Sequence, residues 1–160
     1  MKIKFLSAQA RLPQKATAYS AGFDLYTPRD FVITPGRNVV PLDIAIAIPS
    51  GMEGQIRPRS GFSAKGVEGY PYISDKPLTY DSAAPTRYNA DVLLGTIDSD
   101  YRGCIGVLLK SHEQKPFVIT EGTRIAQLVI APYVITDMEL KDALDDTKRG
   151  DGGFGHTGTH

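Results

Sequence analysis

Short runs of hydrophobic residues separated by turns recur along most of the chain. Within 38–48, isoleucine alternates with alanine from Ile44 to Ile48, which is the period of two expected for a β-strand. Similar runs, bounded by glycine, proline or aspartate, lie at 3–6, 31–33, 52–57, 91–97, 104–109, 116–120 and 124–135. Many short strands with turns at regular spacing predict an all-β fold: a sandwich, a jelly roll or a barrel.

Helical patterns are scarce in the sequence. The segment 60–65 is compatible with one helical turn that has Ser60 as its N-cap. Only 137–148 is long enough for a real helix, and its apolar stripe of Met138, Leu140 and Leu144 is thin. The sequence therefore predicts at most two helices beside the strands.

Two stretches do not match a strand pattern. The segment 67–89 holds four of the eight tyrosines and three prolines, and an irregular loop of this length is usually functional or disordered. The end of the chain, 148–160, contains five of the sixteen glycines. We therefore predict one β-barrel domain over 1–147, with an inserted loop at about 67–89, and a flexible glycine-rich tail over 148–160.

Charge and cysteine content narrow the possible environments. The 18 Lys and Arg residues balance the 18 Asp and Glu residues. A protein that binds along nucleic acid needs a net basic surface, so this balance argues against that function. The longest apolar run, 128–135, is interrupted by Pro132 and is too short to span a membrane. A single cysteine, Cys104, excludes an internal disulfide and fits a reducing compartment such as the cytoplasm. We expect a cytoplasmic protein without nucleic-acid or membrane partners.

Three polar segments have the residue types of a binding or catalytic site. The segment 57–61 places arginines next to the free N–H groups of a helical turn, which is a suitable arrangement for binding an anion. Such arginines are, however, often simply exposed on the surface. A carboxylate after a strand, as at Asp98, can hold and deprotonate a water, but aspartate also favours turns for local reasons. Glycines beside Arg149 can wrap phosphate oxygens, or they can form a frayed terminus. The glycine pattern at 150–155 resembles a dinucleotide-binding motif, but it lacks the strand before it and the helix after it.

Taken together and in order, five segments resemble the five motifs of the trimeric dUTPase family (dUTP diphosphatases). They are Ala21–Leu25, Arg57–Lys65, Gly95–Gly103, Arg124–Leu128 and Arg149–Gly158. The resemblance implies a β jelly roll that assembles as a homotrimer with three sites between subunits. It also implies Mg²⁺-dependent hydrolysis of dUTP to dUMP and pyrophosphate, which keeps uracil out of DNA and supplies dUMP for dTMP synthesis.

The same resemblance implies roles for residues around the nucleoside. Asp98 would hold the attacking water as general base. Tyr101 would pack against the deoxyribose and clash with a 2′-hydroxyl. Backbone groups would read the uracil edge at Gly95, Thr96 and Ile97.

Further residues are implied around the triphosphate. Phosphate groups would be bound by Arg59, Ser60, Gly61 and Gln127. Asp24 would act through water near the Mg²⁺, which needs no direct protein ligand because phosphate oxygens and water supply its coordination.

The tail would close over the nucleotide, usually in the site of a neighbouring subunit. The residues implied are Arg149, Phe154, Gly155 and Thr157. Phe154 would stack on the uracil and Arg149 would face the γ-phosphate. One departure lies here, because His156 stands where the family usually has serine.

The largest departure is about twenty additional residues between the second and third motifs, within 67–89. This insertion is either an ordered decoration of the trimer or a surface for an unknown protein partner.

Three alternative functions remain. One is a dCTP deaminase, which shares the fold but is disfavoured by Tyr101 and the complete tail motif. The others are a nucleotide-gated regulatory protein and a plain β-sandwich binding module.

Overall fold

The computed structural model describes residues 1–75, 78–83 and 85–153. Within these ranges fourteen strands and one helix follow in the order β1 (Lys2–Phe5), β2 (Gly22–Tyr26), β3 (Phe31–Ile33), β4 (Gly36–Pro41), β5 (Ile44–Ala47), β6 (Met52–Arg57), α1 (Ser60–Lys65), β7 (Val67–Asp75), β8 (Leu78–Tyr80), β9 (Thr86–Tyr88), β10 (Ala90–Val92), β11 (Gly95–Ile97), β12 (Gly106–Ser111), β13 (Phe117–Ile119) and β14 (Arg124–Pro132). All their pairings are antiparallel.

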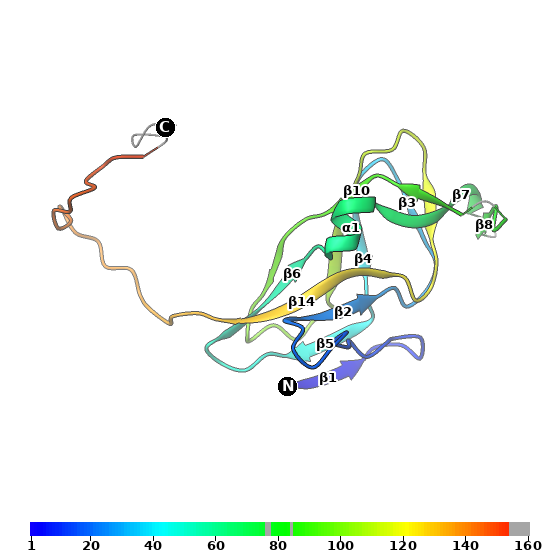
Figure 1. Ribbon diagram of the computed structural model, residues 1–160. Helices are drawn as coiled ribbons and strands as arrows, with labels where there is room; N and C mark the ends of the chain where they lie inside the picture. The colour runs from blue at the N-terminus through cyan, green and yellow to red at the C-terminus, as the bar shows by residue number, and fades with distance from the viewer. Residues whose placement is uncertain (76–77, 84, 154–160) are drawn as a thin grey trace.

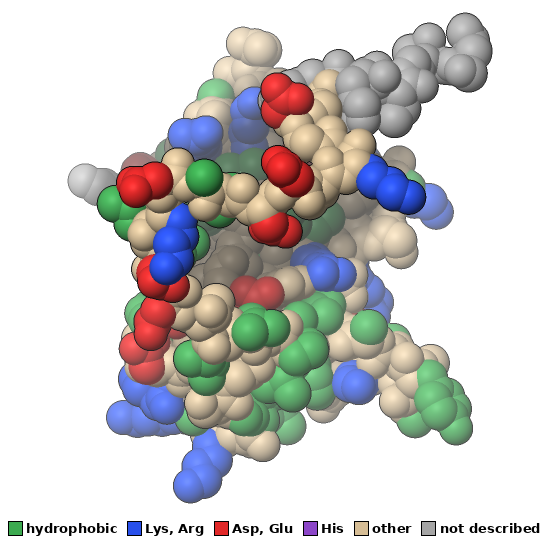
Figure 2. Space-filling view, turned by 90° about the vertical axis from the view of Figure 1, so that its left-hand side faces the viewer, with side chains coloured by type: hydrophobic (Ala, Val, Ile, Leu, Met, Phe, Trp, Pro, Cys, Tyr) green, Lys and Arg blue, Asp and Glu red, His purple; other side chains and the backbone are tan. Residues whose placement is uncertain are grey.

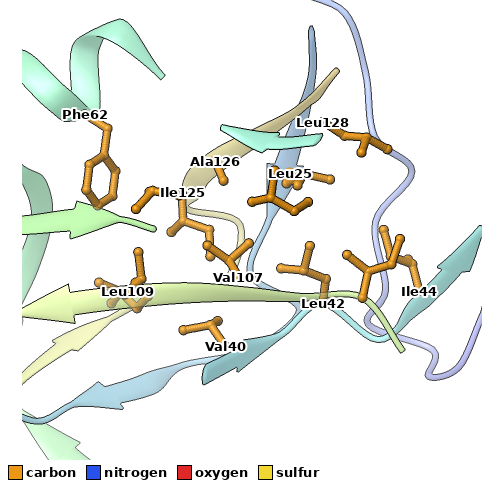
Figure 3. Close-up of a cluster of buried hydrophobic side chains, with 14 of the residues drawn as sticks. Leu25, Val40, Leu42, Ile44, Phe62, Val107, Leu109, Ile125, Ala126 and Leu128 are labelled. Carbon is orange, nitrogen blue, oxygen red and sulfur yellow. The ribbon is translucent and has the colours of Figure 1, made fainter. Parts of the chain in front are cut away.

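The hydrophobic core lies between the two central sheets (Figures 1 and 3). One sheet has the order β10-β12-β4 and the other has the order β11-β6-β14-β2. Val40 and Val107 of the first sheet and Leu25 and Leu128 of the second are completely buried. Because each strand buries alternate side chains, the two inner faces fill one core. The predicted all-β jelly roll is confirmed.

Two predicted strands are each divided in the structure. The run 38–48 becomes β4 and β5, because Asp43 between them adopts a left-handed φ of 55°, which a continuous strand does not allow. Arg29 donates to the Asp43 carboxylate at 2.6 Å and stabilises this bend. The run 91–97 becomes β10 and β11, which pair with β12 and β6 respectively, so the chain passes from one sheet to the other.

Helix formation differs from the prediction at both candidate sites. The helix α1 forms, but its N-cap residue is Arg59 and no side chain caps it; Ser60 is already the first helical residue. The expected helix at 137–148 is absent, and Met138 and Leu140 there are fully exposed. A thin apolar stripe without a surface to pack on does not stabilise a helix. Among the described residues, no helix has the length and apolar character to cross a membrane.

The segment 67–89, named the arm from here on, is not the irregular loop that we expected. Strands β8 and β9 each pair with β7, and β7 also pairs with β13. The Tyr88 ring stacks on Phe117 with centroids 4.1 Å apart. Burial, and then the nearby charge of Glu113, raise the pKa of the Tyr88 hydroxyl. The arm projects from one end of the barrel (Figure 1), anchored by this aromatic contact and by strand pairing.

Candidate functional site

Three neighbouring strands gather three of the candidate segments. Strand β14 lies between β6 and β2 in the sheet. Gln127 of β14 is therefore opposite Arg57 on one side and Asp24 on the other. Strand register alone thus brings the segments 21–25, 57–61 and 124–128 together, although up to 100 residues separate their contacting members.

The carboxylate of Asp24 organises this group. Its side chain is only 11% exposed, and it accepts hydrogen bonds from Arg59 Nε at 2.8 Å and Nη2 at 3.4 Å. Arg124 Nη1 donates to the same carboxylate at 3.4 Å. Charge-assisted bonds in a partly water-excluded place are strong and directional. Asp24 therefore sets the orientation of Arg59. Arg124 belongs to the fourth motif of the sequence, but its contact with Asp24 was not predicted.

Gln127 holds the loop that leads into α1. Its amide Nε2 donates to the carbonyl of Pro58 at 2.9 Å. Gly22 lies against the Gln127 side chain, since a Cβ on this glycine would approach Gln127 Cδ to 2.9 Å. The bond fixes the backbone just before Ser60 and Gly61, which are exposed at the start of α1.

A cavity of about 500 Å³ opens next to this group. Its cationic lining residues come from four places in the chain and are Arg59, Lys65, Arg87 and Arg124. Gly61 also lines it, and the two carboxylates on its wall, Glu68 and Glu121, are already paired with Arg87 and Arg11. Several guanidinium groups around one cavity suit a phosphate-bearing anion. Sequence reasoning did not identify Lys65 and Arg87 as site residues; Arg87 lies in the arm, whose position depends on tertiary contacts.

A second cavity, of about 250 Å³, lies at the edge strand β11. Thr96, Asp98 and Tyr101 line it together with Gly95 and Ile97. Within the described part of the chain, β11 pairs only with β6. Its other edge therefore presents backbone N–H and C=O groups to a planar ligand. The predicted nucleoside residues are brought together here.

The turn after β11 shapes the wall of this second cavity. The Tyr101 N–H donates to the Asp98 carbonyl at 3.1 Å, and Arg102 donates to the carbonyls of Ser99 and Tyr101 at 2.7 and 2.8 Å. Among the described residues, no hydrogen bond or ion pair is found for the exposed Asp98 carboxylate. A carboxylate held on a fixed turn and free of protein partners has the geometry to accept a proton from a water.

The candidate residues of the tail do not lie at either of the two cavities. The two cavities have no lining residue in common. Arg149 is exposed, and its Nε donates to the Gly152 carbonyl at 2.8 Å in a segment that extends away from the barrel (Figure 1). Figure 2 views the molecule from the side on which this segment extends, and acidic side chains are prominent on that side. Phe154, Gly155 and Thr157 lie outside the described residues.

The residues present suit a metal ion that arrives with a polyanion. Among the described residues, no group of three or more His, Cys, Asp or Glu could hold a metal ion. The buried carboxylate of Asp24 already accepts bonds from two guanidinium groups. Mg²⁺ usually keeps several waters and binds through substrate phosphates, and the cationic cavity fits such phosphates.

Comparison with known proteins gives a consistent set of matches. The dUTPase family model matches residues 8–79 and 82–158. The deoxyuridine 5′-triphosphate nucleotidohydrolase of Syntrophotalea carbinolica is 43% identical over 162 residues, covering 99% of this chain and 96% of the relative. The protein of the same name from Clostridium tetani is 40% identical, with coverage of 99% and 96%.

Solved structures agree in fold. The dUTPase of Staphylococcus bacteriophage 80alpha with dUPNHPP has a TM-score of 0.77 at 25% identity, covering 99% of this chain and 98% of that chain. A mutant dUTPase from phage phi11 of S. aureus, which coordinates a structural Mg(II) ion, has a TM-score of 0.70 at 23% identity, with coverage of 89% and 96%.

Proposed function

This chain belongs to the dUTPase family, and we infer that it hydrolyses dUTP to dUMP and pyrophosphate. The observation that carries this conclusion is the full-length match, at 43% identity, to a protein named for that reaction. The reaction lowers the dUTP that would otherwise place uracil in DNA, and it supplies dUMP for dTMP synthesis. A cytoplasmic location fits the single cysteine, Cys104.

The nucleoside half of the substrate would bind in the 250 Å³ cavity. Uracil has both hydrogen-bond donors and acceptors on its edge, and the free backbone edge of β11 offers the complementary groups. Tyr101 would pack against the deoxyribose. Asp98 would orient the attacking water and accept its proton, and its free carboxylate supports this role.

The triphosphate would bind where cationic side chains and backbone N–H groups converge. Arg59, Ser60 and Gly61 would contact the phosphates, and Gln127 would contribute by holding the preceding loop and through its amide. Asp24 would act through water while keeping Arg59 oriented. Mg²⁺ bound to the triphosphate would supply further neutralisation of its negative charge. Fixed positive groups of this kind stabilise charge that develops during hydrolysis.

A complete site would need more than one copy of the chain. The separation of the two cavities within one chain supports a homotrimer in which one subunit supplies the nucleoside half and its neighbour supplies the phosphate half. Arg149, Phe154, Gly155 and Thr157 would come from a tail that closes over the nucleotide and excludes water. An additional protein partner at the arm stays a prediction.

The test is release of pyrophosphate from dUTP, UTP, dTTP and dCTP, with Mg²⁺ and with excess chelator. We expect strong preference for dUTP and loss of activity with the chelator. Release of ammonia from dCTP would instead indicate a deaminase, and absence of pyrophosphate from dUTP would refute the proposed reaction.

A further inference from the structure

The ring of Tyr101 lies directly over Gly103. A Cβ built on this glycine would approach Tyr101 Cζ to 2.5 Å and Cε2 to 2.9 Å, with the hydroxyl oxygen also in conflict. Cβ atoms do not approach other heavy atoms this closely, so any side chain at position 103 must displace the ring. The ring occupies the space that only glycine leaves open.

Space, and not backbone conformation, is what requires glycine here. Gly103 is absent from the glycines with positive φ, so its backbone is accessible to alanine. The obstructing atoms are at the far end of a side chain that is 45% exposed. An alanine at 103 would therefore rotate the Tyr101 ring and leave the strands on either side of the turn in place.

The ring position is further defined by one hydrogen bond. The Tyr101 hydroxyl donates to the Cys104 carbonyl at 3.0 Å. This bond and the contact with Gly103 place the ring across the turn, where Tyr101 and Cys104 both line the 250 Å³ cavity. A rotated ring loses the bond and changes the shape of the cavity wall.

We propose that Gly103 is a positioning residue for sugar selectivity, because it lets Tyr101 lie close enough to the turn to form the wall that a 2′-hydroxyl would meet. The inference rests on the proposed function, in which this cavity receives the deoxyribose of dUTP. Gly103 itself touches no substrate and acts through the ring. Selectivity then depends on a glycine outside the cavity lining as well as on the tyrosine.

The experiment measures kcat/KM for dUTP and for UTP in four proteins: the wild type, Gly103→Ala, Tyr101→Ala and the double variant. Gly103→Ala should lower the dUTP-to-UTP ratio by about tenfold or more, since a change of one methylene in the fit of a pocket alters discrimination by about 10- to 200-fold. In the Tyr101→Ala background the same glycine change should have no further effect on the ratio, because the ring through which it acts is gone.

Thermal unfolding at equal protein concentration accompanies the kinetics. An unchanged Tm for Gly103→Ala with a reduced ratio supports the inference, because a general loss of packing would lower the Tm and turnover of both nucleotides equally. A wild type that fails to hydrolyse dUTP overturns the proposed function. A wild type that selects dUTP, together with a Gly103→Ala variant of the same selectivity, overturns this inference alone. An equal effect of the glycine change with and without the Tyr101 ring also overturns it.

Discussion

Replacement of Asp24 by asparagine tests whether one buried carboxylate organises the proposed phosphate-binding half of the site. Asparagine keeps the size of the side chain and removes its charge. Arg59 would then be left partly buried, with 27% of its side chain exposed, opposite a neutral group. Arg124, which is 52% exposed, would lose a weaker contact. We expect loss of both folding stability and phosphate affinity.

The size of the effect follows from burial. Breaking a fully buried ion pair costs about 3–5 kcal/mol, whereas an exposed pair contributes about 0–1 kcal/mol. Asp24 is 11% exposed and its first partner 27%, so an intermediate loss of about 2 kcal/mol is expected. With a slope of about 2 kcal/mol/M in urea, the unfolding midpoint should fall by about 1 M.

The matched control is Glu121→Gln, which neutralises an exposed carboxylate bonded to Arg11 at 3.0 Å. The side chains of this pair are 49% and 46% exposed, so its loss should cost about 0.5 kcal/mol. Urea unfolding of both variants at the same protein concentration removes the contribution of assembly to apparent stability. The KM for dUTP of Asp24→Asn should also rise, because Arg59 loses its orientation. If Asp24→Asn is no more destabilising than Glu121→Gln, the burial argument is wrong.

Two further predictions concern turnover. Asp98→Asn should leave the free energy of unfolding within about 0.5 kcal/mol of the wild type, because the exposed carboxylate has no protein partner among the described residues. Pyrophosphate release should be abolished, and retained activity would refute the assigned base. A chain ending at Asp146 should keep its oligomeric state, measured by light scattering, because it retains every strand of the barrel. It should lose most activity because the proposed closing tail is removed, and an unchanged kcat would show that the tail is dispensable.

Local pattern was sufficient for much of the fold. The bounds of β3 and β6 agree with the hydrophobic runs at 31–33 and 52–57, because alternation of buried and exposed side chains is a local property of a strand. The division of 38–48 was not predictable, since it depends on the left-handed residue Asp43 and on its bond to Arg29. The arm was misread because its prolines and tyrosines obscure the alternation, and because its order depends on contact with Phe117.

The sequence by itself determined the residue types of the site, their order along the chain and the all-β class, since each is a property of single residues or short runs. Only the tertiary structure decided which of them meet. The contact of Asp24 with Arg59 and Arg124 joins positions 35 and 100 residues apart, and strand register, which depends on packing of the whole core, sets it. The contact of Tyr101 with Gly103 is close in sequence, yet it depends on the rotamer of one ring in a folded turn. Local composition does not encode either geometry.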